Sequence, residues 1–338
     1  MKTAILGAGK IAGTLAVTMR SLAEVECYAV ASRSLEKAQQ FAAEHGFQKA
    51  YGSYSEMLAD EEVELVYIAT PHSHHYEHMK LCIEAGKHVL CEKAFTTTRE
   101  QAEEIFRLAK ERDVLVTEAI WTRYMPSREI INGLLEEGVI GEVKTLTANL
   151  SYAVSGKERI IRPELAGGAL LDVGVYTLNF ALMHFGNRIK RKQSAAQLTE
   201  TGVDGQNAIT LFYEDGRFAV LNSGIYGMSD RQGVFYGSKG WMVVDNINNP
   251  LEVKIYNEKR ELCRTVSMPE QINGYEYEIL ETIDCIRNGK RECPSMKHED
   301  TLEVMEMMDA FRQEWGVSYP VESIQELSLI HISEPTRP

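Results

Sequence analysis

The sequence has few of the features that mark nucleic-acid-binding proteins. Its 36 Lys and Arg are outnumbered by 49 Asp and Glu, which gives a formal net charge of −13, and no basic run or arginine-rich helix is present. Nucleic acid is therefore a poor partner, because binding to a phosphate backbone depends on clustered positive charge. The acidic balance mainly favours solubility.

Signals for export, membrane insertion and disulfide formation are also scarce. The first apolar stretch, residues 4–7 (AILG), is too short for a signal peptide or a membrane span. The six cysteines include no C-x-x-C pair, and a chain of this length needs no disulfide staples. We therefore expect reduced thiols and a cytoplasmic protein with no membrane partner.

The length of 338 residues exceeds what a single hydrophobic core usually supports, so two domains are predicted. We expect an NAD(P)-binding domain at residues 1–120 and a domain for substrate binding and oligomerisation at residues 121–326. Residues 327–338 (LSLIHISEPTRP) resemble the translation of a sequencing-library adapter. We expect them to be a non-native tail and exclude them from the fold.

Short apolar runs alternate with amphipathic stretches through the first 120 residues. This alternation predicts a doubly wound α/β fold of the Rossmann type, in which helices wrap a parallel sheet. Near-continuous Val, Ile and Leu in the runs indicates strands buried on both faces. The predicted strands are 3–6, 25–31, 65–69, 88–91 and 114–117. The predicted helices are 11–21, 35–45, 76–85 and 99–111.

From residue 142 onward the apolar residues alternate over longer runs, which predicts a mostly antiparallel open sheet and an α+β domain. Residues 214–217 (EDGR) contain the Asp-Gly pair typical of hairpin turns. Helices at 168–185 and 274–288 are expected to cover one face of this sheet. A last helix at 298–315 is expected to return to the first domain. The predicted strands are 143–152, 207–213, 217–223, 231–236 and 241–245.

The pattern G-x-G-x-x-A occupies residues 7–12 (GAGKIA), between the first predicted strand and the first predicted helix. The first glycine permits a tight turn, the second lets the backbone approach a pyrophosphate, and the alanine allows close helix packing. The first N–H groups of the helix then face the phosphates. In this context the motif predicts a dinucleotide site formed by Gly7, Ala8, Gly9, Lys10 and Ile11.

The residues after the second predicted strand bear on the choice of cofactor. Enzymes that use NAD place Asp or Glu there for the ribose hydroxyls, whereas this chain has Ser32 and Arg33. Arg33 offers paired donors for a 2′-phosphate and a plane to stack on adenine, although a solvent-facing arginine is the alternative. We predict NADP as the preferred cofactor, with NAD possible.

Three further segments resemble the glucose-fructose oxidoreductase and inositol dehydrogenase (Gfo/Idh/MocA) family. They are residues 69–71 (ATP), 86–93 (GKHVLCEK) and 167–176 (GGALLDVGVY). Residues 118–126 (EAIWTRYMP) look most like the branch of dimeric dihydrodiol and NADP-linked xylose dehydrogenases. The resemblance covers residues 1–320. It implies a dehydrogenase or reductase that transfers hydride between a nicotinamide and a sugar, a polyol or a trans-dihydrodiol.

The same resemblance implies that Lys93 lies beside the nicotinamide and that Asp172 and Tyr176 arrive from the second domain. Oxidising an alcohol requires a base within hydrogen-bond reach of the hydroxyl proton. We assign Tyr176 as the acid/base, Lys93 as the cation that lowers its pKa and anchors substrate, and Asp172 as an acceptor for a substrate hydroxyl. Further cofactor contacts are expected from Thr70, Pro71, His75, Glu92 and Lys93.

Spacing supports this assignment independently. Asp172 and Tyr176 are four residues apart, which places them on one face of a helix. Gly167 and Gly168 precede them and allow that helix start to approach another surface closely. The alternative is a helix-start carboxylate with a half-buried tyrosine.

Relatives usually follow the lysine with proline, often in a cis bond, and often carry His where Tyr176 stands. This chain has Ala94 after Lys93. A cis bond before a residue other than proline costs about 3 to 4 kcal/mol. We therefore expect a trans peptide and a shifted Lys93.

His72, His74, His75 and His78 form a cluster that suggests a metal site. Hydride transfer to a nicotinamide needs no metal, and the zinc pattern H-E-x-x-H is absent. We predict no metal, and we interpret His75 as a residue of the cofactor pocket or of a helix start.

Trp121, Arg123 and Tyr124 follow a strand at the edge of the sheet where doubly wound folds bind ligands. They are interpreted either as substrate contacts or as a packing tryptophan and a domain-bridging arginine. The open face of the second sheet is expected to pair with a copy of itself in a homodimer.

The sequence as a whole predicts an NADP-preferring oxidoreductase acting on CH–OH groups of a small molecule. Two alternatives remain at this point. One is an enzyme that holds its cofactor tightly and recycles it in place. The other is a non-catalytic NADP-binding sensor or scaffold, because a fold does not guarantee chemistry.

Overall fold

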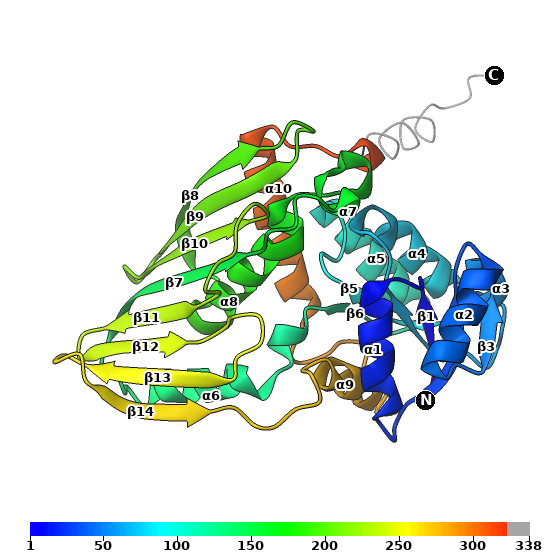
Figure 1. Ribbon diagram of the computed structural model, residues 1–338, viewed down its shortest axis with the longest axis horizontal. Helices are drawn as coiled ribbons and strands as arrows, with labels where there is room; N and C mark the ends of the chain where they lie inside the picture. Colours follow the sequence, from blue (N-terminus) through cyan, green and yellow to red (C-terminus); the bar gives the residue numbers. More distant parts are fainter. Residues whose placement is uncertain (323–338) are drawn as a thin grey trace.

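The computed structural model describes residues 1–322, which form two sheets lying side by side (Figure 1). The predicted tail at 327–338 and the last residues of the predicted second domain lie outside the described residues. The fold class is confirmed, because a parallel sheet in the N-terminal part is followed by a mostly antiparallel one.

The first sheet has six parallel strands in the order β3-β2-β1-β4-β5-β6. Its strands are β1 (Lys2–Leu6), β2 (Glu26–Ala31), β3 (Lys49–Tyr51), β4 (Leu65–Ile68), β5 (His88–Glu92) and β6 (Val116–Ala119). The connecting helices are α1 (Lys10–Arg20), α2 (Leu35–His45), α3 (Tyr54–Leu58), α4 (His72–Glu84) and α5 (Arg99–Glu111).

The strands of this sheet are buried on both faces, as their apolar runs predict. Ile5 and Tyr67 on one face join the apolar sides of α1 and α2 in a core of their own. Leu6 and Ile68 on the other face join the core that contains residues of α4 and α5. The C-terminal ends of β1, β4 and β5 therefore emerge at one edge between two layers of helices.

The second sheet has eight strands in the order β14-β13-β12-β11-β7-β10-β9-β8. All neighbours are antiparallel except β7 and β10. The predicted turn at 214–217 joins β9 to β10, with Gly216 at φ +87°. The strands are β7 (Val143–Ser151), β8 (Ile189–Leu198), β9 (Asp204–Tyr213), β10 (Phe218–Gly224), β11 (Gly233–Gly237), β12 (Gly240–Val244), β13 (Glu252–Asn257) and β14 (Leu262–Ser267).

Helix α8 (Val175–Phe185) packs on β7 and β10, and α6 (Pro126–Glu136) packs on α8. The prediction that residues 274–288 cover this sheet is wrong. Helix α9 (Glu276–Arg287) packs instead on α1 and β5, with Ile279 and Ile283 in the core of the first sheet. An amphipathic pattern shows that a helix needs an apolar partner, but it does not show which one.

Helix α10 (His298–Trp315) lies across both parts of the chain, because it contacts α5 of the first layer and α8 of the second (Figure 1). The remaining helical segments are short: η1 (Trp121–Arg123), α7 (Glu158–Ile161), η2 (Pro163–Leu165) and η3 (Leu170–Gly174).

Within residues 1–322, one helical stretch, Pro163–Phe185, is long and apolar enough to cross a membrane. Its most apolar window is 94% buried inside the fold. A core helix passes the same length and composition test, so this stretch is explained by packing.

Candidate active site

The glycine turn after β1 forms a cradle of backbone N–H groups. Gly7 has φ +105°, and a Cβ there would lie 3.0 Å from the carbonyl oxygen of Ala69 and from Cγ2 of Thr70. Gly9 is the N-cap of α1, and no side chain caps that end. A Cβ on Gly9 would meet nothing closer than the Ala69 oxygen at 3.9 Å, so space is open in front of the helix. This arrangement fits a diphosphate, because the free N–H groups at a helix N-terminus bind anions.

The end of β2 presents a cation toward the same edge. Ser32 is buried and Arg33 is exposed. Burial lowers the pKa of His74 and His78, and the charge of Arg33 lowers both further, so the guanidinium lies near the start of α4. No carboxylate stands between residues 31 and 35. This end of the sheet therefore offers a hydroxyl and a guanidinium, and no carboxylate.

Lys93, Asp172 and Tyr176 meet between the two parts of the chain. The Lys93 ammonium donates to the carbonyl oxygen of Asp172 at 2.6 Å and to its Oδ1 at 3.3 Å. It also lies 5.1 Å from the ring centroid of Tyr176. All three residues come from the segments that the sequence singled out.

Asp172 is held by two cations. Burial alone would raise the pKa of its carboxyl, but the charges of Lys93 and Arg159 hold it well below the usual value. Arg159 of α7 donates to Oδ1 of Asp172 at 2.8 Å while half of its side chain stays exposed. The sequence analysis missed Arg159, because it stands in no motif and its partner is 13 residues away. The site therefore contains an ionised, partly neutralised carboxylate.

Tyr176 is almost fully buried, and the indole N–H of Trp121 donates to its hydroxyl at 3.0 Å. Burial raises the pKa of Tyr176 well above its usual value, and nearby Tyr275 and Glu92 raise it further. The expected lowering by Lys93 is therefore not the net result, because desolvation of the phenolate outweighs it. In this arrangement Tyr176 is a neutral phenol.

The three residues interpreted as substrate contacts have different surroundings. Trp121 stacks on Tyr275 with ring centroids 4.3 Å apart, beside Tyr176. Arg123 is 2% exposed and pairs with Asn179 at 2.5 Å and Asp300 at 3.0 Å. This pairing joins η1 to α8 and α10, all within residues 121–326. The hydroxyl of Tyr124 is buried against Thr117 and the carbonyl oxygen of Glu118.

The histidines of α4 make hydrogen bonds to backbone and side-chain oxygens. The ring of His75 lies 2.8 Å from the carbonyl oxygens of both Thr70 and Ala94, so it ties the end of β4 to the segment after Lys93. His72 contacts the carbonyl oxygen of Ala166 at 3.0 Å, and burial lowers its pKa to about 3. His78 contacts Thr70 Oγ1 at 3.0 Å. Across the part of the chain that the structure describes, no group of His, Cys, Asp or Glu converges as a metal site.

The peptide bond between Lys93 and Ala94 is cis, so the expectation of a trans bond is wrong. The neighbouring groups are fixed by tertiary contacts, since Ala94 O lies against His75 and the N–H of Phe95 donates to Glu118 at 3.1 Å. Local preference was the only argument available from sequence. Just before this bond, Glu92 accepts from the hydroxyl of Tyr67 and from the N–H of Lys93.

The segment that carries Asp172 is a π-helical turn (η3, Leu170–Gly174) that leads directly into α8. The spacing of four residues between Asp172 and Tyr176 therefore spans a junction of two helix types. Both side chains still reach Lys93. Gly167 and Gly168 allow the close approach that their position predicts, because a Cβ on Gly167 would lie 2.4 Å from the carbonyl oxygen of Ile160.

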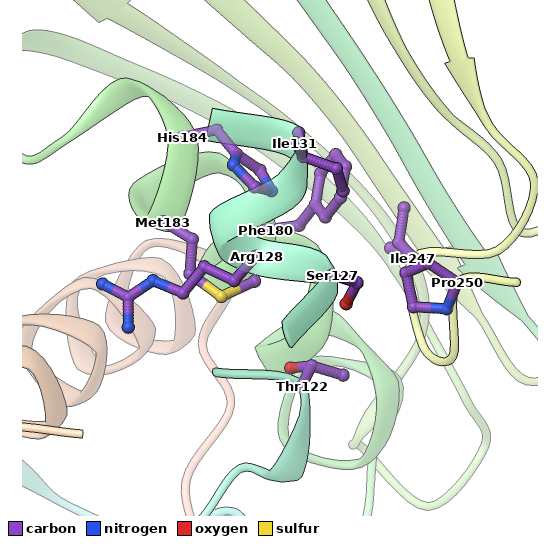
Figure 2. Close-up of a pocket in the computed structure, with 9 residues that line it drawn as sticks. All are labelled: Thr122, Ser127, Arg128, Ile131, Phe180, Met183, His184, Ile247 and Pro250. Carbon is purple, nitrogen blue, oxygen red and sulfur yellow. The ribbon is translucent and has the colours of Figure 1, made fainter. Parts of the chain in front are cut away.

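A small cavity lies on the far part of α8, between that helix, α6 and the loop at 245–250 (Figure 2). Phe180, Met183 and His184 face it from α8, and Ser127, Arg128 and Ile131 face it from α6. It contains none of Lys93, Asp172 or Tyr176, so it is separate from the site described above.

Two models of one protein family match most of the chain. The family described as an oxidoreductase family with an NAD-binding Rossmann fold (GFO_IDH_MocA) matches residues 1–120, and a GFO/IDH/MocA C-terminal domain matches residues 130–243.

Two curated relatives are trans-1,2-dihydrobenzene-1,2-diol dehydrogenases. The protein from Xenopus tropicalis is 34% identical over 94% of this chain and 99% of its own length. The protein from Danio rerio is 32% identical over 96% of this chain and 99% of its own length.

Among solved structures, a 3-ketoreductase from Actinomadura kijaniata in complex with NADP and TDP-benzene is similar, with a TM-score of 0.86 at 25% identity. The similarity covers 94% of this chain and 98% of that one. An aldose-aldose oxidoreductase from Caulobacter crescentus has the same fold, with a TM-score of 0.83 at 20% identity over 93% of this chain and 96% of that one.

Proposed function

The chain belongs to the Gfo/Idh/MocA oxidoreductase family and is a dehydrogenase or reductase, and from that premise we propose that it transfers hydride between NADP and a small polyhydroxylated substrate. The substrate class is a sugar, a polyol or a trans-dihydrodiol. The observation that carries the proposal is the meeting of Lys93, Asp172 and Tyr176 at the edge of the sheet beyond the glycine turn.

The cofactor is proposed to be held by the residues at the C-terminal ends of β1, β2, β4 and β5. Gly7 to Ile11 surround the diphosphate position, and Ser32 with Arg33 face the adenosine end. Thr70, Pro71, His75 and Glu92 follow β4 and β5, where the nicotinamide half of the dinucleotide binds in this fold. Bound NADP supplies the hydride acceptor or, when reduced, the hydride donor.

Tyr176 is proposed to exchange the hydroxyl proton of the substrate. As a neutral buried phenol it donates this proton when a carbonyl is reduced. In the oxidation direction the phenol must first release its own proton to solvent, and the resulting phenolate, stabilised by the ammonium of Lys93 above its ring, then accepts the hydroxyl proton of the substrate. The Trp121 N–H fixes the direction of the Tyr176 hydroxyl.

Lys93 and Asp172 are proposed to orient the substrate. Lys93 Nζ is a triple donor and carries two bonds to Asp172, so a third is available to a substrate oxygen. Asp172 stays ionised at neutral pH and can accept from a second hydroxyl. Two adjacent hydroxyls on one molecule satisfy both groups, which is why a sugar or diol fits better than a simple alcohol.

The outer face of the second sheet supports a homodimer. Side chains of β12 and β13 alternate between a buried set, such as Met242 and Ile255, and a partly exposed set. Trp241 stacks on Tyr256 in the exposed set, with ring centroids 4.9 Å apart, in a shallow hollow. We propose that two copies pair through this face, and light scattering should give twice the mass of 38.1 kDa.

The test of the proposed function is Tyr176→Phe. It removes the hydroxyl and keeps the ring beneath Lys93, so turnover on a panel of sugars, polyols and diols should fall at least about 100-fold. The affinity for NADPH, measured by titration of its fluorescence, should stay within about twofold. Tyr236→Phe on exposed β11 is the matched control and should leave both values unchanged.

The contrary outcomes separate the alternatives. Binding of NADP without turnover on any substrate would favour a sensor or scaffold. Nicotinamide that stays with the protein through dialysis would favour an enzyme that recycles its cofactor in place. Unchanged turnover in Tyr176→Phe would remove the tyrosine from the proposal.

A further inference from the structure

A buried polar cluster from the second sheet lies directly behind the π-helical turn. Its members are Asp204 at the start of β9, Asn207 on β9 and Ser223 on β10. Asp204 Oδ2 accepts from the N–H of Leu170 at 2.8 Å and from the Asn207 amide at 2.9 Å. The Ser223 hydroxyl donates to Asn207 Oδ1 at 2.9 Å. The cluster thus binds the first residue of the turn that carries Asp172.

The backbone of this segment approaches the cluster closely at two glycines. A Cβ on Gly168, which has φ +118°, would lie 2.4 Å from Asp204 Oδ1. A Cβ on Gly174 would lie 3.0 Å from the Ser223 hydroxyl. The turn is therefore in contact with the cluster at both of its ends.

The opposite side of the same turn belongs to the active site. Lys93 donates to the backbone carbonyl of Asp172 as well as to its carboxylate. Tyr176 follows two residues after the turn ends, in the first turn of α8. A shift of the turn would therefore move the Asp172 carbonyl, and with it the position of Lys93 relative to Tyr176.

We propose that Asp204 is a positioning residue: its carboxylate, with Asn207 and Ser223, holds the π-helical turn in the register that brings Asp172 and Tyr176 to Lys93. This inference rests on the proposed function, because it concerns the catalytic efficiency of the same site. Asp204 touches neither the substrate position nor the cofactor position, and it acts only through the turn.

The charge on Asp204 sets how firmly the turn is held. Burial raises its pKa to about 6, although the bonds from Asn207 and Leu170 lower it. Arg312 of α10 is the cation that faces it, and the Tyr319 ring lies between that cation and the Gly167 carbonyl. An ionised acceptor binds N–H groups more strongly than a neutral one. The turn is therefore held best above pH 6.

The stability effect has the opposite sign. Because the pKa of Asp204 is raised by folding, its stabilising contribution is complete below about pH 4 and is lost as pH rises through about 6. At neutral pH, ionised Asp204 thus holds the π-helical turn more firmly but lowers the free energy of unfolding.

The experiment is Asp204→Asn, with Asp215→Asn as the matched control in the exposed hairpin at the other end of β9. At pH 7.5 we expect kcat to fall about tenfold, the cofactor affinity to stay within about twofold, and Tm to remain within a few degrees of the native value. The native enzyme should also gain activity with an apparent pKa near 6 as pH rises, and Asp204→Asn should lose this rise. Asp215→Asn should match the native enzyme in all four measurements.

The outcomes distinguish this inference from the proposed function. If Tyr176→Phe abolishes turnover but Asp204→Asn keeps the native kcat and pH profile, the positioning role is overturned and the proposed function stands. If the native protein turns over no substrate, the proposed function fails. Amide hydrogen exchange of residues 168–176 still tests whether Asp204 holds the π-helical turn. Exchange that is no faster in Asp204→Asn than in the native protein would then overturn this positioning role.

Discussion

The proposed cofactor side and the proposed catalytic side of the site are formed by different kinds of groups. The cofactor side is mainly backbone: a glycine turn pressed against Ala69 and an uncapped helix start at Gly9. The catalytic side consists of buried ionisable side chains, among them Lys93 and Asp172, that come from segments 79 residues apart in the chain.

The difference shows how the sequence determines each side of the site. A backbone cradle requires only that certain positions have no Cβ, so a local motif specifies it completely. A cluster of buried charges must be positioned by the rest of the fold, and each desolvated group shifts its pKa accordingly. Changes on the cofactor side should therefore affect binding, whereas changes on the catalytic side should affect turnover and pH dependence.

Gly7→Val should give the largest effect on the cofactor side. Valine does not adopt φ +105° without strain, and its Cβ would meet the Ala69 carbonyl at 3.0 Å. The affinity for NADP, measured by calorimetry, should fall on the order of 100-fold. Gly46→Val is the control, because Gly46 also has positive φ but lies away from the cradle, with Arg20 at 3.7 Å as its nearest neighbour. Equal losses in the two variants would mean that the cradle has no special role.

Arg33→Ala should give a smaller and more selective effect. Loss of its charged hydrogen bonds should weaken NADP binding about tenfold and leave NAD binding within about twofold. Titration of both cofactors against native protein and variant measures this ratio. A native protein that binds NAD as tightly as NADP would contradict the proposed preference.

Glu118→Gln tests the buried charges behind the catalytic side. Glu118 accepts from the Phe95 N–H and from Thr301, and burial raises its pKa to about 7. Its contribution to stability is complete below about pH 4.5 and is lost as pH rises through about 7. The variant should therefore gain up to about 3 kcal/mol relative to the native protein between pH 5 and pH 8.

Thermal unfolding at the two pH values measures this gain, and Glu129→Gln on the exposed side of α6 is the control. An equal effect of Glu118→Gln at pH 5 and pH 8 would show that folding does not raise the pKa of Glu118, because the carboxyl would then be ionised to the same extent in the folded and unfolded states.

The sequence predicted those strands in which burial is reflected in the order of apolar and polar residues. Strands β1, β4 and β5 are apolar on both faces, and β7 alternates, so each was placed within a few residues. Strands β3, β8, β13 and β14 were missed. Of these, β8 and β14 lie at edges of the second sheet, and most of their side chains are exposed. A strand with no buried face has no periodicity to detect.

The residues of the candidate site were also predictable only in part. Lys93, Asp172 and Tyr176 were found through motifs, and the structure brings them together. Arg159 and Asp204 were missed, because their contacts with the π-helical turn depend on how separate segments of the chain pack together. Two predictions were wrong: the bond after Lys93 is cis rather than trans, and the pKa of Tyr176 is raised rather than lowered. Both properties depend on tertiary surroundings.

The position of α9 has a consequence for how the chain matures. Helices α1 and α2 cover only part of one face of a sheet whose last strand ends at residue 119, and Ile279 and Ile283 complete that core, so part of the face stays open until more than 150 further residues have left the ribosome. N-terminal segments of most multidomain chains fold as they emerge. Here the core of the first sheet is completed only when α9 has been synthesised. A fragment that ends near residue 120 would therefore expose apolar surface to the chaperones of the cell.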